Sequence, residues 1–236
     1  MNSKRESIFV DREEILGRLN DTKNDVIDGN GKVVFLKGER GIGKTKVAET
    51  FIERCVREGF KVFQGRCLYY ETSEPYIPFY DALEGHFDQQ QVDEEKEQTS
   101  NLGLMVQRGL SSSQQGRSHL GLIGTGEEEN KGSKKLSKDS KREMMFNQLT
   151  DFILDTSKES PVVLFLDDLQ WIDESSSQLL HHLSRNITDN KVMILGAYRP
   201  EELKRKQNEN PLQNILIRMK KRETFRYHRY TKDGSR

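Results

Sequence analysis

The segment GERGIGKT at residues 38–45 constrains the fold of this chain more than any other feature of its sequence. It matches the pattern G-x-x-x-x-G-K-[ST], whose glycines let successive backbone N–H groups point at phosphate oxygens. A β-branched and aromatic run at 33–37 precedes the segment, and apolar residues recur at helical spacing from Val47 to Val56 after it. Because the order strand, glycine-rich loop, helix is the setting this pattern requires, we expect a phosphate-binding loop. The alternative is a chance glycine-rich turn with a solvated lysine.

The residues of this loop have expected parts in binding a nucleoside triphosphate. The helix that starts near Lys44 directs its positive end at the phosphates. We expect Lys44 to reach the β- and γ-phosphates and the hydroxyl of Thr45 to bind Mg²⁺. The candidate nucleotide-binding residues in the loop are Gly38, Glu39, Arg40, Gly41, Ile42, Gly43, Lys44, Thr45 and Lys46.

A second group for the metal is expected on a neighbouring strand, because Thr45 alone cannot hold Mg²⁺ beside a triphosphate. Residues 162–168 read VVLFLDD, an apolar strand that ends in two carboxylates. Asp167 is the candidate Mg²⁺ ligand, directly or through water. Asp168 is the candidate to polarise the attacking water, and its alternative role is a helix or turn cap.

The remaining pattern alternates between strands and helices. Expected strands lie at 61–69, 161–166 and 191–197, and expected helices at 77–87, 143–156, 175–184 and 211–221. Strands buried on both faces and separated by helices predict an α/β fold, a three-layer P-loop NTPase with a parallel sheet between helical layers. The expected ATPase core covers residues 1–87 and 143–217.

Residues 88–142 differ in composition from the rest of the chain. These 55 residues contain no Phe, Tyr or Trp, and only ten are Val, Ile, Leu or Met. Such a segment cannot bury enough apolar surface to offset its ordering entropy, so we expect a low-complexity, mostly disordered insertion. It is either a tolerated surface loop or a segment that docks a partner.

Charge and hydropathy limit the partners. The chain has 38 basic and 38 acidic residues, so its zero net charge gives no overall attraction to nucleic acid or an anionic membrane. No run of about 18 apolar residues exists and the opening residues lack an apolar signal core, so we expect a cytoplasmic protein without membrane contact. Cys55 and Cys67 are expected to be small core residues.

The tail at 218–236 is locally basic. It holds eight Lys or Arg against two acidic residues, interleaved with Phe225, Tyr227 and Tyr230. This pattern is compatible with nucleic-acid contact. The alternative is one more basic helix followed by a frayed, solvated end.

Four segments in order, IFVDREEIL, GERGIGKT, LFLDDLQWID and LGAYRPEEL, resemble AAA-type ATPase domains of the STAND class, which are related to origin-recognition ATPases. The resemblance covers roughly residues 7–87 and 143–218. It implies an ATP-binding, slowly hydrolysing nucleotide switch, the core of a signalling or transcription-regulatory ATPase, with ATP and Mg²⁺ as cofactors. Family members continue into a helical lid and a winged-helix module, which we expect to be missing here, so the partners are ATP or ADP and other proteins or further domains.

The resemblance also implies roles for residues outside the two central motifs. Phe9, Val10 and Arg12 would lie near the adenine and ribose, with Asp11 where the family usually has glycine. Arg199 matches the family's arginine that senses the γ-phosphate, and its alternative is a salt-bridged surface arginine.

The same resemblance implies that Trp171 and Asp173 shape the turn after the strand that carries Asp167; a packed core or rim aromatic is the alternative for Trp171. The candidate catalytic residues are thus Lys44, Asp168 and Arg199. Two other functions remain open: a P-loop kinase, and a DNA-associated loading or remodelling ATPase of the origin-recognition kind.

Overall fold

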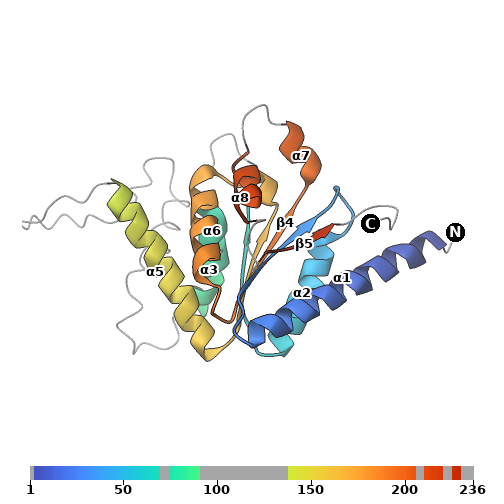
Figure 1. The fold of residues 1–236 in the computed structure, drawn as a ribbon, viewed down its shortest axis with the longest axis horizontal. Coiled ribbons are helices and arrows are strands. Elements are labelled where there is room, and N and C mark those ends of the chain that lie inside the picture. The colour runs from blue at the N-terminus through green and yellow to red at the C-terminus, as the bar shows by residue number, and fades with distance from the viewer. Residues whose placement is uncertain (1–2, 70–74, 91–137, 206–209, 220–224, 230–236) are drawn as a thin grey trace, which may run out of the picture.

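Five parallel strands form one sheet at the centre of the described part of the chain (Figure 1). The computed structural model describes residues 3–69, 75–90, 138–205, 210–219 and 225–229, and for 3–12, 84–90, 138, 141, 204–205 and 225–229 it describes the backbone only. The strands are β1 (Lys32–Lys37), β2 (Lys61–Arg66), β3 (Val162–Asp167), β4 (Val192–Tyr198) and β5 (Phe225–Arg229). Their order across the sheet is β2-β3-β4-β1-β5.

Helices cover both faces of this sheet (Figure 1). On one face lie α1 (Ser3–Ile27) and α2 (Lys44–Arg57). The other face carries α3 (Ile77–Gln90), α5 (Lys138–Glu159), α6 (Glu174–Asn186) and α8 (Pro211–Met219). Successive side chains of a strand point to opposite faces of the sheet. In β1, Val34 and Leu36 therefore pack on the face covered by α1 and α2, and Val33 and Phe35 pack on the opposite face. The predicted three-layer α/β fold is therefore confirmed.

Several predicted boundaries were wrong. β2 ends at Arg66 and not at residue 69, although the amide of Cys67 still donates to the carbonyl of Asp167 at the end of β3 (3.0 Å). Helices also enter both ends of the predicted insertion, since α3 continues to Gln90 and α5 begins at Lys138. The charged start of α5 is compatible with a helix because an exposed turn needs little apolar surface, and Arg142 pairs there with Asp139 (3.2 Å). Residues 91–137 lie outside the described residues.

Neither the helix at the start of the described chain nor the strand at its end was predicted. Residues 3–27 form helix α1, of which Ile15, Leu16, Leu19 and Val26 are buried. In the basic tail, residues 225–229 are not a frayed end but strand β5, aligned with β1 from Val33 beside Phe225 to Lys37 beside Arg229. The rest of the tail after Met219 lies outside the described residues.

The carboxyl ends of β1, β3 and β4 meet at one edge of the sheet. Leu36 and Lys37 lie beside Ala197 and Tyr198, and Leu166 lies beside Gly196. A side chain at Gly196 would come within 2.4 Å of Leu169 and 2.7 Å of Phe35, so only glycine lets the segment after β3 pack this closely on β4. This edge brings the loop after β1, the aspartates after β3 and Arg199 after β4 together.

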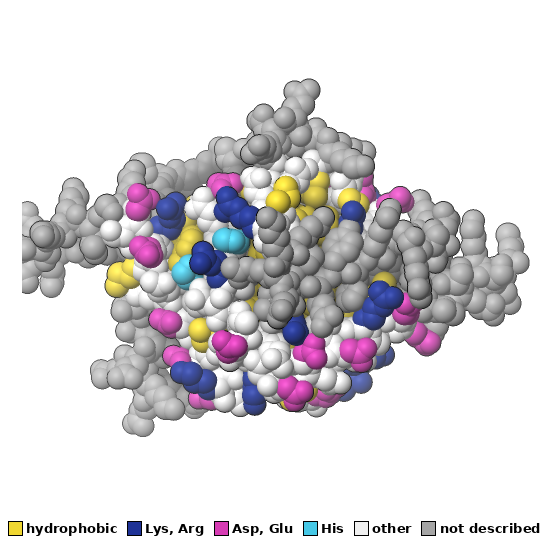
Figure 2. Space-filling model, viewed as in Figure 1, with side chains coloured by type: hydrophobic (Ala, Val, Ile, Leu, Met, Phe, Trp, Pro, Cys, Tyr) yellow, Lys and Arg dark blue, Asp and Glu magenta, His cyan; other side chains and the backbone are white. Residues whose placement is uncertain are grey.

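Two surface properties bear on possible partners. None of the helices in the described ranges is long and apolar enough to cross a membrane. On the face shown in Figure 2, basic and acidic side chains of the described residues are interspersed along the lower rim. That distribution agrees with the zero net charge of the chain.

Candidate functional site

The loop between β1 and α2 has the geometry of an anion cradle. Gly41 (φ 77°) and Gly43 (φ 99°) adopt left-handed conformations that glycine favours. Gly43 directly precedes α2 and contributes no side-chain cap. Since the first-turn amides of a helix have no acceptor within it, the start of α2 presents N–H donors and the positive end of the helix to the site.

Lys44 is folded against this loop. Its Nζ donates hydrogen bonds to the carbonyl oxygens of Gly38 (2.7 Å) and Glu39 (2.8 Å), and the residue is only 7% exposed. Burial lowers the pKa of the Lys44 ammonium, and the positive charge of Arg199 lowers it further. Lys44 and Arg199 repel each other beside the same cavity, so an anion bound between them is expected to be favourable.

Thr45 and Asp167 join the loop to β3. The Thr45 hydroxyl donates to Oδ2 of Asp167 (3.0 Å), and Oδ1 of Asp167 accepts the backbone N–H of Asp168 (2.7 Å). Burial raises the pKa of Asp167, against the opposing effect of these hydrogen bonds. A hydroxyl and a carboxylate this close are the oxygen donors that Mg²⁺ prefers, so these two side chains fit the expected metal site.

Asp168 is held by four N–H donors. Oδ2 accepts from Nε (3.0 Å) and Nη2 (2.7 Å) of Arg66, and Oδ1 accepts from Nε2 of Gln170 (2.8 Å) and Nη2 of Arg199 (2.8 Å). Burial alone would raise the pKa of Asp168, but the bonds from Arg66 and Gln170 and the charges of both arginines outweigh it and lower the pKa. Asp168 therefore lies in the site as a firmly ionised carboxylate.

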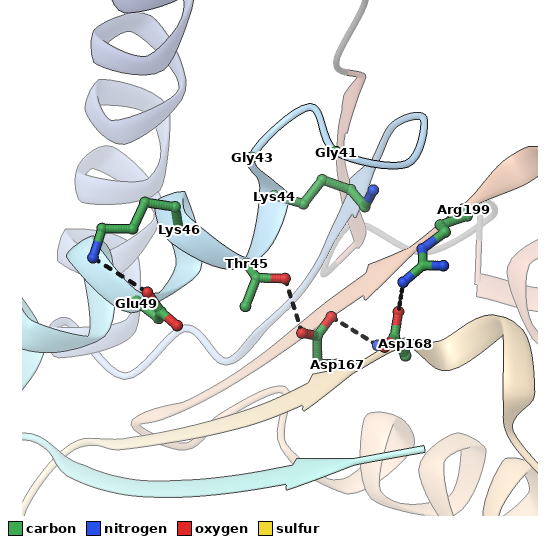
Figure 3. Close-up of a pocket in the computed structure, with 9 residues that line it drawn as sticks. All are labelled: Gly41, Gly43, Lys44, Thr45, Lys46, Glu49, Asp167, Asp168 and Arg199. Carbon is green, nitrogen blue, oxygen red and sulfur yellow. Dashed lines mark hydrogen bonds and ion pairs between the residues drawn. The ribbon is translucent and has the colours of Figure 1, made fainter. Parts of the chain in front are cut away.

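The phosphate loop, both aspartates and Arg199 line an open cavity of about 350 Å³, shown in Figure 3. That volume lies within the usual range for small-ligand sites. Its lining residues are Gly41, Gly43, Lys44, Thr45, Lys46, Glu49, Asp167, Asp168 and Arg199. Lys44 and Asp167 thus face the same space, as a triphosphate site requires.

The other predicted loop residues hold the loop in place through backbone hydrogen bonds, core packing or an ion pair. The Gly38 amide donates to the carbonyl of Tyr198 (3.3 Å), and the Arg40 amide donates to Oε1 of Glu201 (2.9 Å). Ile42 packs against the core on the α1 and α2 face. Lys46 points away from Lys44 and pairs with Glu49 (3.3 Å; Figure 3).

The predicted adenine contacts are not placed by the structure. Phe9, Val10 and Arg12 belong to helix α1, and their side chains lie outside those described. Their proximity to a nucleotide stays a prediction.

The turn after β3 contains both residues that the sequence singled out there. Trp171 ends the short 3₁₀ helix η1 (Leu169–Trp171), and its ring packs on Tyr69 with centroids 4.4 Å apart. Asp173 caps α6, since its Oδ1 accepts the Ser176 amide (2.9 Å).

Sequence reasoning missed three residues at the site: Arg66, Gln170 and Glu201. Arg66 could have been found, because it lies within the predicted strand at 61–69 and the carboxyl end of that strand lies at the same sheet edge as the phosphate loop. Gln170 follows the aspartates by two positions but carries no charge that would mark it. Glu201, at the start of α7 (Pro200–Arg205), contacts the loop from 161 positions away, which no local pattern shows.

The family model described as AAA ATPase domain matches residues 8–195. A comparison with curated proteins finds no match.

Among solved structures, a chain of Drosophila ORC bound to GC-rich DNA and Cdc6 is 11% identical with a TM-score of 0.48, and one of Drosophila ORC bound to AT-rich DNA and Cdc6 is 12% identical with a TM-score of 0.45. The match covers 97% and 98% of this chain but 59% and 58% of those chains. C. elegans PCH-2 is 13% identical, with a TM-score of 0.40 and coverage of 92% of this chain and 42% of that one. The chain therefore spans less than two thirds of these proteins.

Proposed function

The chain belongs to the AAA ATPase domain family, and on this premise we propose that it binds Mg·ATP in the cavity around Lys44 and hydrolyses it slowly as a nucleotide switch. The observation that carries the proposal is the convergence of Lys44, Thr45, Asp167 and Arg199 on one cavity. The loop amides at the start of α2 would bind the phosphates, and Lys44 would exchange its two carbonyl acceptors for phosphate oxygens.

Thr45 and Asp167 would hold the metal. Their oxygens already lie 3.0 Å apart. When bound there, Mg²⁺ supplies positive charge beside the phosphates. We propose adenine as the base because of the family alone.

Slow hydrolysis follows from the bonding of Asp168. A carboxylate offers about four lone-pair positions, and the donors of Arg66, Gln170 and Arg199 occupy that number. A carboxylate with a lowered pKa is also a weak base. Asp168 can therefore polarise water only after a donor leaves, and Arg199 would leave when it binds the γ-phosphate.

This coupling favours a switch in which the γ-phosphate is registered before it is cleaved. Arg199 would bond to Asp168 without a γ-phosphate and to the phosphate with one, and contacts of the α7 segment beside it would change with it. We propose that protein partners or neighbouring domains detect this change, as in signalling ATPases of the STAND class.

The test is nucleotide-dependent thermal stability and calorimetric binding of the full chain. At a Mg·ATP concentration of 100 times Kd we expect stabilisation of about 2.7 kcal/mol, or a rise in Tm of about 5–10 °C. Lys44→Ala should lose this rise, because the ammonium that bridges the phosphates is gone. Lys32→Ala is the matched control, since Lys32 lies at the opposite end of β1 and pairs with Asp25 (3.6 Å).

Equal Mg·ATP stabilisation of Lys44→Ala and Lys32→Ala would contradict the proposal. The product of turnover separates the switch from a phosphoryl transferase. Release of inorganic phosphate in the absence of any acceptor supports the switch, and transfer of the γ-phosphate to a metabolite supports the kinase.

A further inference from the structure

Gln170 is the most deeply buried polar residue next to the site. It lies in η1, two residues after Asp168, and is 0% exposed. A buried amide must have all of its polar atoms bonded or it destabilises the fold. The partners of Gln170 therefore show what the residue is used for.

The side-chain amide of Gln170 joins the two groups expected to act on the γ-phosphate. Its Nε2 donates to Oδ1 of Asp168 (2.8 Å), and its Oε1 accepts the backbone N–H of Arg199 (3.0 Å). A carboxylate only accepts and a backbone N–H only donates, so the orientation of the amide is fixed. Only a side chain with a donor and an acceptor at its tip satisfies both neighbours.

The main chain of Gln170 continues this connection. Its carbonyl accepts Nδ2 of Asn210 (3.2 Å), which is itself 1% exposed. Oδ1 of Asn210 accepts the amide of Leu212 (2.9 Å) in the first turn of α8. A continuous chain of hydrogen bonds thus runs from Asp168 to the start of α8.

We propose that Gln170 is the positioning residue that holds the Asp168 carboxylate and the Arg199 backbone in one fixed arrangement and links both to α8. The inference rests on the proposed function. When the Arg199 guanidinium leaves Asp168 for the γ-phosphate, the bonds of Gln170 keep the carboxylate and the Arg199 main chain where they are. Gln170 therefore matters for ATP, which has a γ-phosphate, and little for ADP.

The test compares Kd values for Mg·ATP and Mg·ADP by calorimetry on the full chain. Gln170→Met keeps the length of the side chain but removes both polar contacts. We expect about tenfold weaker ATP binding, with ADP binding changed less than about threefold. The reason is that Arg199 loses the bond that positions its main chain, and its guanidinium is expected to contact the γ-phosphate, which ADP lacks. Gln178→Met is the matched control, since Gln178 lies on α6 and bonds instead to Glu174 (3.1 Å) and Arg142 (3.2 Å).

Gln170→Glu tests the same role by pH and keeps the shape of the side chain. In its neutral form the new carboxyl can still donate to Asp168, and in its ionised form it repels that carboxylate. The quantity to compare is the preference for ATP, the ratio of the Kd for Mg·ADP to the Kd for Mg·ATP. We expect this preference in Gln170→Glu to be close to that of the parent at pH 6 and to fall several-fold at pH 9, while the preference of the parent changes less. A substitution that acted only through the volume of the side chain would not produce this dependence.

The outcomes separate the two proposals. A parent chain that binds no Mg·ATP contradicts the proposed function. A parent chain that binds ATP and ADP equally would overturn the role of Gln170. So would variants at residue 170 that keep the parent's preference for ATP, or that bind both nucleotides more weakly by the same factor at every pH.

Discussion

Two adjacent aspartates at the site have opposite electrostatic environments. Asp167 is buried beside uncharged donors, and its pKa is raised by that burial. Asp168 faces two guanidinium groups, and its pKa is lowered despite its own burial. The ionised form of Asp167 therefore destabilises the folded state, whereas the ionised form of Asp168 stabilises it.

We expect Asp167→Asn to stabilise the protein by about 1 kcal/mol at pH 7, because it removes a buried charge. The amide can accept the Asp168 N–H through Oδ1 and donate to the Thr45 hydroxyl through Nδ2, so both hydrogen bonds persist. Denaturant unfolding without nucleotide measures the gain. The same variant should lose metal-dependent nucleotide binding.

The gain should depend on pH in a definite direction. The folded pKa of Asp167 lies above its unfolded value of about 3.9, so the unfolded state releases its proton first and stability falls as pH rises between the two values. The advantage of Asp167→Asn is thus complete above the folded pKa and absent below about pH 4. Asp168→Asn is the control of opposite sign: it should destabilise at pH 7, because its carboxylate pairs with Arg66 and Arg199. Destabilisation by both variants at pH 7 would refute this account.

Residues that lie within a motif could be predicted, and those that act across the fold could not. Lys44, Thr45 and Asp167 were assigned from local spacing, and the structure brings them to one cavity. Arg66 and Glu201 reach the site from other elements, so their contacts depend on the strand order. A sequence shows the chemistry of a side chain but not its distant partner.

Helix α6 begins at a cap that also fixes the start of α3. Asp173 accepts the Ser176 amide, and the Ser176 hydroxyl both donates to Asp173 and accepts the amide of Tyr76 (3.0 Å). We expect Asp173→Ala to lower the free energy of unfolding by about 1–2 kcal/mol, the upper part of the range for loss of a helix cap, because the Ser176 hydroxyl loses its acceptor as well. Chemical denaturation measures it.

Asp155→Ala is the control for this cap. Asp155 is an exposed helical aspartate that pairs with Lys158 three residues on (2.6 Å). Its loss should cost less than about 0.5 kcal/mol. An effect of Asp173→Ala as small as that of Asp155→Ala would show that the cap does not stabilise α6.

Among the strands, the three central ones were predictable, and of the two edge strands β2 was predicted with a different end and β5 was not predicted. β1, β3 and β4 are apolar runs, because helices cover both faces of the sheet. β5 reads FRYHR, which has no such run, so its sequence alone suggested a solvated tail. Its strand conformation comes from pairing with β1, nearly two hundred positions earlier in the chain.

The position of β5 makes the sheet depend on the end of the described chain. β5 pairs along β1 from Val33 to Lys37, and the phosphate-binding loop follows β1 directly. A chain that ends at Met219 would leave β1 as an edge strand with its outer amides and carbonyls in water. At roughly 1 kcal/mol net for each ladder hydrogen bond, less the entropy of ordering β5, we expect a loss of about 2–4 kcal/mol in the free energy of unfolding.

Hydrogen exchange gives this prediction a residue-level readout. Successive amides of a strand point to opposite neighbours, so only every second amide of β1 should lose protection in the chain that ends at Met219, while those facing β4 keep it. A chain that ends at Arg229 retains β5 and is the control. It should match the full chain in stability and in the exchange of β1. Equal stability of the two shortened chains, with unchanged protection throughout β1, would mean that β5 does not hold the sheet edge beside the phosphate loop.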